Sequence, residues 1–460
     1  MEEITFTNPT KEIVSFDVIQ MGVMGWNQSK FTTENFNGME FTIAKGIIDV
    51  VTENKVKHLC IAIGSTKMPI NIRLKEHDFN SKYNVITVVK YSNTLLSGKL
   101  ENLERVLADL ETNVLQELRE ATTIGFNKLR KEHIDAWNGI WRSGFEISNS
   151  LAKDALNGDQ INATLYYVLS SSRAPLFELN SIPLAVTNST SQIDAKAELK
   201  FSMQRCYEGV STLYASKLWK LPRNETGVAN LTSVWSLTLD RFGCHGLLEL
   251  GASGIMQSMI LSLGGLRFTN HHLDLNLNPR QLHRDYGFRR VNYANLSFVT
   301  IEIEVGKDNH ALLYATLDEL IEPDVRFYAC DAGCIDPSVE LTLHERRQFP
   351  VKLTNPLTPI LYISSEKKYI DELKHAVHVE EIDIAPAQDV NTIAIHKHGH
   401  QMAGLATLFW TLFVILIIVF HLFLIKLVYR ECNNNNAGGG QNNNYASYES
   451  NRKYRYARTV

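Results

Sequence analysis

The run "AGLATLFWTLFVILIIVFHLFLI", from Ala403 to Ile425, constrains the fold of this chain most, because its 23 residues include no formally charged side chain. As an α-helix rising about 1.5 Å per residue, it is longer than the roughly 30 Å hydrocarbon layer of a bilayer. A soluble helix this long that is apolar on every face is rare. The sequence therefore predicts a single-pass membrane protein with the lipid bilayer as a partner.

The charges beside this run predict its orientation. Lys426 and Arg430 follow it directly, and more basic residues lie in the tail, so the positive-inside rule places the C-terminus in the cytosol. The large N-terminal part is then lumenal or extracellular, which indicates the endoplasmic reticulum, the Golgi or the cell surface. The opening "MEEITFTNPTKEIV" has no apolar signal segment, so we expect a signal to precede it.

Glycosylation sequons and cysteines agree with a secretory-pathway glycoprotein. Each Asn-x-Ser/Thr triplet lies before the apolar run, and the six candidate asparagines are Asn27, Asn162, Asn188, Asn224, Asn230 and Asn295. The spacing in "CDAGC" lets Cys330 and Cys334 close a small disulfide loop, with buried free thiols as the alternative. Cys432, just inside the membrane, is a palmitoylation candidate.

Composition and motifs exclude several classes of protein. A net charge of −4 without zinc-finger spacing or a basic helix argues against nucleic acid as a partner. The glycine-rich stretch Leu248 to Phe268 has neither dinucleotide-binding nor phosphate-loop spacing, so we expect a core helix there and no cofactor. No metal site is predicted, because neither "CDAGC" nor the histidines at 271, 272 and 283 have further ligands at suitable spacing.

The pattern of apolar residues predicts an α+β protein. Short runs rich in Val, Ile and Thr predict a β-sandwich-like region at 1–97, and Leu103 to Leu118 repeats at helical spacing within a helical linker at 98–235. A second β-rich region follows at 236–395. The membrane helix at 403–425 and a disordered cytoplasmic tail at 430–460 complete the chain.

Two segments resemble maltose and trehalose phosphorylase-type glycoside hydrolases. One holds Gly254, Gln257 and "GLRF" at 265–268, and the other holds His133, Trp137 and Trp141. In that family a complete α/α barrel with the catalytic glutamate separates the two segments, whereas only about 75 residues, from Arg173 to Leu247, do so here. The resemblance implies a glycosidase-like domain that lacks most of its catalytic barrel.

The chain as a whole resembles an uncharacterised animal family of single-pass type I membrane proteins. The segments that carry this resemblance are "GGLRFTNHHLDLNLNPRQLHRDYGFRRVNYANLSF", "ACDAGCIDP", "PVKLTNPLTPILYIS" and "HKHGHQMAGLATLFW". The family implies a topology rather than a mechanism.

These observations predict a non-catalytic lumenal domain that binds a glycan or a protein partner. The alternatives are a glycoside-active enzyme with unrecognised catalytic residues and a trafficking or adaptor membrane protein. No motif singles out a catalytic residue among the glutamates where an acid would have to lie, which are Glu178, Glu198, Glu208 and Glu225.

One pair of tryptophans and one run of histidines each have two possible interpretations. Trp137 and Trp141 lie one helical turn apart and either stack on a sugar or, as we expect, pack in a core. His396, His398 and His400 alternate, so an extended chain would align them to bind metal or sense pH, whereas a solvated stalk is the default interpretation.

Overall fold

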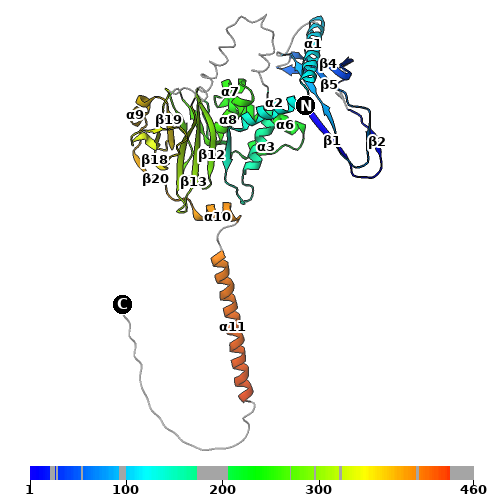
Figure 1. Cartoon of the computed structure of the whole chain (residues 1–460). Helices are drawn as coiled ribbons and strands as arrows, with labels where there is room; N and C mark the ends of the chain where they lie inside the picture. Colours follow the sequence, from blue (N-terminus) through cyan, green and yellow to red (C-terminus); the bar gives the residue numbers. More distant parts are fainter. Residues whose placement is uncertain are drawn as a thin grey trace, which may run out of the picture. The chain divides into compact units, whose positions relative to one another are not determined.

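The computed structural model describes residues 1–20, 26, 29–52, 55–92, 100–172, 206–269, 271–294, 297–320, 324–399 and 404–435. The chain is a mixed α+β protein, as predicted, and forms two compact units, Met1–Arg142 and Ser143–Val460 (Figure 1). The division between them falls inside the helical region that we expected at 98–235.

The first unit is built from antiparallel strands. Its largest sheet has the order β3-β4-β5-β8, and two smaller sheets pair β1 with β7 and β2 with β6. The strands are β1 Glu2–Asn8, β2 Val14–Asp17, β3 Lys30–Phe36, β4 Met39–Thr52, β5 Lys55–Thr66, β6 Asn71–Leu74, β7 Asp78–Val85 and β8 Thr87–Tyr91.

Helix α1, Leu100–Ile124, packs on the four-stranded sheet through the apolar face that the sequence predicts. Val114 and Leu118 are fully buried against Phe41 and Ala62. Gly64 on β5 makes this close approach feasible, because a Cβ atom there would lie 2.5 Å from the Val114 side chain. The periodic leucines and valines therefore form the core of this unit.

Helix α2, Phe126–Trp141, differs from our expectation. The chain breaks at Gly125, whose φ of 86° lies in the left-handed region, and α2 contains no buried side chain. Trp137 and Trp141 stack on each other with ring centroids 6.2 Å apart, and both are half-buried. The expectation that these two residues occupy a core is wrong, since spacing on a helix fixes a shared face but not what covers that face.

The second unit contains two five-stranded antiparallel sheets, in the orders β17-β14-β13-β12-β9 and β10-β11-β19-β15-β16, and a β18-β20 pair. Burial alternates along β13 and β14, so one face of the first sheet is buried. The strands are β9 Gly144–Ile147, β10 Leu266–Phe268, β11 Leu273–Leu275, β12 Tyr286–Ala294, β13 Ser297–Val305, β14 Ala311–Glu319, β15 Phe327–Asp331, β16 Val339–Leu341, β17 Arg347–Pro350, β18 Lys352–Asn355, β19 Leu361–Ser364 and β20 Glu381–Ile384.

Helix α8, Ala252–Gly264, is the centre of the second unit. Residues 254–264 are all buried, and the helix contacts β9, β10, β12, α3, α6 and α7. A Cβ atom at Gly254 would lie 1.9 Å from the Leu247 carbonyl oxygen, so only glycine allows α7 to approach so closely. This confirms that the glycine-rich stretch is a core helix.

The other helices of this unit surround α8 or cover the sheets. Trp219 and Trp235, both almost completely buried, meet edge to face with centroids 4.9 Å apart. The helices are α3 Gly158–Ser170, η1 Thr212–Tyr214, η2 Ser216–Trp219, α6 Glu225–Arg241, α7 His245–Glu249, η3 Pro279–Gln281, η4 Ala332–Cys334, α9 Lys367–Ala376 and α10 Val390–His398.

Helix α11, Gly404–Asn435, contains the predicted apolar run. Of the described part of the chain, its segment Leu408–Cys432 alone is long and apolar enough to cross a membrane. The helix continues ten residues beyond Ile425, so residues 430–435 are helical where we expected the disordered tail to have begun. Lys426 and Arg430 are good helix formers that allow this continuation.

Candidate functional site

The best-formed polar cluster lies on one face of the sheet β10-β11-β19-β15-β16. Arg267, Asp274, Tyr362 and Cys330 are cross-strand partners on four successive strands, so their side chains share this face. We call the following six residues the Asp274 site: Arg267, His271, His272, Asp274, Tyr362 and Tyr369. Helix α9 packs on the same face through Ile370 and Leu373.

Asp274 is the most unusual member, because a carboxylate is rarely fully buried unless it is paired. Its Oδ2 accepts hydrogen bonds from Arg267 Nε at 3.1 Å and Arg267 Nη2 at 2.6 Å. Its Oδ1 has no hydrogen-bond partner among the described residues. The Arg267 side chain is 42% exposed, so one charge of this pair is internal and the other reaches the surface.

His272 joins this pair to the aromatic residues. Its Nε2 lies 3.6 Å from Asp274 Oδ2, an ion-pair distance rather than a hydrogen bond. Its Nδ1 lies 2.9 Å from Thr269 Oγ1 and 3.1 Å from the Tyr369 hydroxyl. The His272 ring is stacked on Tyr369, with centroids 5.5 Å apart. These contacts fix the positions of both rings.

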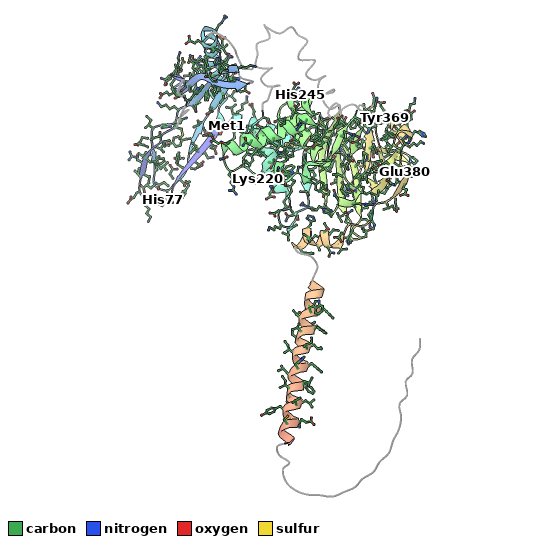
Figure 2. The ribbon with its side chains drawn as sticks, turned by 180° about the vertical axis from the view of Figure 1, so that it is seen from behind. Met1, His77, Lys220, His245, Tyr369 and Glu380 are labelled. Atoms are coloured by element: carbon green, nitrogen blue, oxygen red, sulfur yellow. A yellow bond between two sulfur atoms is a disulfide. The ribbon has the colours of Figure 1, made fainter. Side chains whose placement is uncertain are left out.

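The outer rim of the site is formed by His271, Tyr369 and Glu366. The exposed His271 ring lies 4.7 Å from the Tyr369 ring, and its Nδ1 is 3.1 Å from Glu366 Oε1. Figure 2 shows Tyr369 at the outer edge of the second unit. These two rings form an aromatic rim that His272 connects to the pair of Asp274 and Arg267.

The local sequence explains how these groups meet. Thr269 N donates to the His272 carbonyl oxygen, which closes the turn between β10 and β11 and places Arg267 opposite Asp274. Tyr362 follows on β19 because this strand pairs with β11. Tyr369 comes from the first turns of α9, which begins three residues after β19 ends.

The electrostatics of the site act on Arg267 and on its two tyrosines. Burial lowers the pKa of Arg267, but hydrogen bonds and charge from Asp274 raise that pKa by more, so Arg267 stays a cation. Burial, followed by the Asp274 charge, raises the pKa of Tyr362. Burial, followed by Glu366 and Asp274, raises the pKa of Tyr369, so both phenols are neutral donors at pH 7.

This arrangement suits binding better than bond cleavage. A glycosidase normally needs two carboxylates flanking the bond. Asp274 is enclosed behind Arg267, and Glu366 on the rim is engaged by His271. Within the described ranges, no group of three or more His, Cys, Asp or Glu residues could hold a metal ion.

The structure places half of the glycosylation candidates. Asn162 on α3 and Asn224 and Asn230 at the start of α6 and within it are exposed, whereas Asn27, Asn188 and Asn295 lie outside the described residues. The Asn224 side chain also caps α6 by accepting a hydrogen bond from Gly227 N.

Four cysteines form disulfides in the structure. Cys330 bonds to Cys334 beside Tyr362, and Cys206 bonds to Cys244 across 38 residues, a pair that sequence reasoning did not select. Cys60 is a buried free thiol, and Cys432 is exposed at the end of α11.

The structure describes two of the four glutamates that we considered for an acid. Glu208 and Glu225 are exposed, Glu225 being the first residue of α6, and Glu178 and Glu198 lie outside the described residues. None of the four belongs to the Asp274 site, although Glu208 acts electrostatically on Arg267.

The sequence analysis considered His271 and His272 only as metal ligands, and it missed Asp274, Tyr362 and Tyr369. One signal was present: in "LDL" an aspartate lies between two apolar residues of a strand that is buried throughout. A charge in such a strand needs a partner, and Arg267 lies at the facing hairpin position.

Comparisons with known proteins identify relatives but no mechanism. The family described as "Uncharacterized conserved protein (DUF2152)" matches residues 1–448. "Uncharacterized protein KIAA2013 homolog" of Xenopus tropicalis is 31% identical over 437 residues, which cover 94% of this chain and 67% of that relative. The homologue of Xenopus laevis is 31% identical over 439 residues, or 94% of this chain and 68% of that relative.

A sugar-active enzyme matches a smaller part of the chain. "Protein-glucosylgalactosylhydroxylysine glucosidase" of Dictyostelium discoideum is 31% identical over 112 residues, which cover 23% of this chain and 15% of that enzyme. No solved structure matches. The expected partial similarity to glycoside-active proteins is confirmed in this coarse form.

Proposed function

The chain belongs to the family described as "Uncharacterized conserved protein (DUF2152)", and we propose that it is a type I membrane glycoprotein whose N-terminal part binds a protein-linked glycan without cleaving it. The observation that carries the proposal is the partly exposed Arg267 guanidinium, which a fully buried Asp274 holds through two hydrogen bonds in the site whose rim is formed by His271 and Tyr369.

Three features support the proposed topology. Segment Leu408–Cys432 is long and apolar enough to span a bilayer, and Lys426 and Arg430 lie in its C-terminal part. Three sequon asparagines are exposed on the second unit. The two disulfides of that unit fit an oxidising compartment.

The chemistry of the rim supports a sugar as the ligand. A pyranose ring has an apolar face that packs on aromatic rings, and its hydroxyls pair with charged hydrogen-bonding groups. His271 and Tyr369 offer the rings, and Glu366 offers an acceptor. The two bonds to Asp274 use Nε and Nη2 of Arg267, which leaves Nη1 to donate to a hydroxyl.

The similarity to a glucosidase indicates which glycan to test first. That enzyme's name specifies a glucosylgalactosyl group on hydroxylysine, so a glycopeptide carrying this disaccharide is the first ligand to test. A site that binds this sugar without cleaving it is consistent with its two carboxylates. Asp274 is enclosed behind Arg267, and Glu366 on the rim is paired with His271.

The test measures binding of this glycopeptide, and of an array of protein-linked glycans, to the full chain in detergent. Arg267→Gln should weaken binding by roughly 10-fold or more, because a hydrogen bond to a charged group contributes about 1.5–3 kcal/mol. Tyr369→Ala should also weaken binding.

The matched control is Arg326→Gln, since Arg326 lies in the same unit, is exposed and pairs with Glu340 on β16. Equal binding by Arg267→Gln and the wild type would contradict the proposal. Release of glucose from the glycopeptide would favour the enzyme alternative instead.

A further inference from the structure

A second cluster of titratable groups lies where α10 packs on the rest of the second unit. The rings of His283 and His396 are stacked, with centroids 5.1 Å apart and an interplanar angle of 15°. His283 precedes β12, and His396 is in the last turn of α10. Both rings are half-buried.

The position of α10 depends on contacts made by the same residue. The His396 carbonyl oxygen accepts a hydrogen bond from Leu151 N at 2.8 Å, and His396 Nδ1 lies 2.7 Å from Ser150 Oγ. Since Ser150 Oγ already accepts from Ala152 N at 3.1 Å, it can donate its own hydrogen to Nδ1 of a neutral imidazole. Protonation of Nδ1 removes that acceptor, so the Ser150 hydroxyl must turn and accept from Nδ1 instead.

A buried cation lies next to the two rings. The Arg284 side chain donates to Ser148 O, to Leu156 O at 2.7 Å and to Asn157 Oδ1 at 2.9 Å. Its hydrogen-bond acceptors are all uncharged, so its positive charge is not neutralised by a direct ion pair among the described contacts. A second positive charge on an adjacent imidazole is therefore unfavourable.

The surrounding charges do not offset the effect of Arg284 on the two imidazole rings. Burial, followed by His283 and Arg284, lowers the pKa of His396, and burial, followed by Arg284, lowers the pKa of His283. The carboxylate of Asp285 acts on Arg284 and accepts a hydrogen bond from Val305 N. Other ionisable groups lie on the segments that pack together here. Lys153 and Asp154 follow Ser150, and Tyr286 begins β12. Asp308 and His310 lie near Gln388, Asp389 caps the N-terminus of α10, and Lys397 and His398 are in its last turn.

We propose that His283 and His396 form an acid-sensitive contact that holds α10 in place at neutral pH and releases it when the rings are protonated. Figure 1 shows α10 at the end of strands β12 and β13, and α10 is the last described element before α11. Release of α10 would free the segment that joins the folded unit to the proposed membrane helix. This inference does not depend on glycan binding.

The direction of the effect follows from proton linkage. Because docking lowers the pKa of both rings below the ordinary value of about 6.5, the undocked state binds protons more readily. The full stability of docking is present above about pH 6.5 and is lost as pH falls through the lowered pKa values. The docking equilibrium can fall by up to about tenfold per pH unit for each ring.

Hydrogen exchange of the full chain in lipid nanodiscs tests the proposal at pH 7.5 and 5.5, with exposure times scaled for intrinsic rates. Protection of amides in Val390–His398, which include buried Ile393 and Ala394, should fall about tenfold or more at pH 5.5. Peptides from β13 should keep their protection. An equal loss in β13 would mean general unfolding and overturn the proposal.

The decisive variant is His283→Phe combined with His396→Gln, which removes both titrating rings. The ratio of α10 protection between the two pH values should approach one in this variant, even if docking is weaker at both. His283→Phe alone, which keeps the Ser150 contact, should give an intermediate ratio. The control His375→Gln changes an exposed histidine on α9 and should respond like the wild type. A wild-type ratio in the double variant would overturn the proposal.

Discussion

Replacement of Trp235 by alanine should be among the most damaging single changes in the second unit. The side chain is fully buried on α6, its ring meets Trp219 at 4.9 Å, and its Nε1 donates to Leu218 O at 3.0 Å. Loss of a buried tryptophan side chain costs about 3–5 kcal/mol through lost transfer energy and the resulting cavity. The unpaired Leu218 carbonyl adds about 1 kcal/mol or more.

The expected cost is therefore roughly 4–6 kcal/mol, which is comparable with the whole stability of a small domain. Trp137→Ala is the matched comparison, because α2 has no buried side chain and half-exposed Trp137 should cost roughly 1–2 kcal/mol. Trp235→Phe keeps most of the ring and should lie between these two values.

Pulse proteolysis in urea measures these costs without using tryptophan fluorescence, which the substitutions themselves would change. The full chain in detergent is digested briefly at each urea concentration, and the surviving first unit, which holds Trp137, and second unit, which holds Trp235, are quantified separately. A Trp235→Ala cost below about 2 kcal/mol, or a Trp137→Ala cost as large as that of Trp235→Ala, would refute this reasoning.

Three further outcomes are expected. Glycosidase treatment of the full-length protein from animal cells should increase its gel mobility, and changing the three exposed sequon asparagines to Gln should remove part of that shift; an unmodified protein would contradict the lumenal assignment. Replacing Cys206 and Cys244 together by Ser should lower the stability of the second unit by about 2–5 kcal/mol, measured by the same proteolysis, and an unchanged urea midpoint would show that this disulfide does not stabilise the unit. Gly254→Ala should prevent the close packing of α7 on α8 and reduce the yield of folded protein, because its Cβ would overlap the Leu247 carbonyl oxygen; normal yield and stability would contradict the packing argument.

The spacing of apolar residues gave the most reliable predictions from the sequence. The spacing from Leu103 to Leu118 predicted α1 and its buried face, and the glycine-rich, largely apolar stretch around Met259 predicted a core helix. These predictions succeeded because the hydrophobic effect acts locally along such runs. Trp137 shows what periodicity cannot predict. Its spacing defines the helix face on which it lies, but other elements of the fold determine whether that face is buried.

The histidines before α11 show a second limit. The alternation in "HKHGH" suggested an extended chain, but α10 ends only at His398, and Gly399 follows in the left-handed conformation. His396 therefore meets His283, more than a hundred residues away, instead of aligning with His398, and His400 lies outside the described residues. The pH-sensing interpretation survives as a proposal, but its partner could not be read from local spacing.

The Asp274 site could be predicted only in part for the same reason. The neighbouring residues of "RFTNHHLDL" bring Arg267, His272 and Asp274 together through a hairpin, which sequence reasoning can anticipate. Tyr362 and Tyr369 join through the pairing of β11 with β19 and the docking of α9. These tertiary contacts join segments that lie about ninety residues apart in the sequence.

The length of the apolar segment in α11 also bears on its fit to bilayers of different thickness. Its uncharged part, residues 404–425, extends about 33 Å as a helix, against roughly 27 Å of hydrocarbon in the endoplasmic reticulum and 32–33 Å in the plasma membrane. Hydrophobic mismatch costs fractions of a kcal/mol per Å, which tilting relieves in part. A helix of this length can span either bilayer, with more tilt in the thinner one.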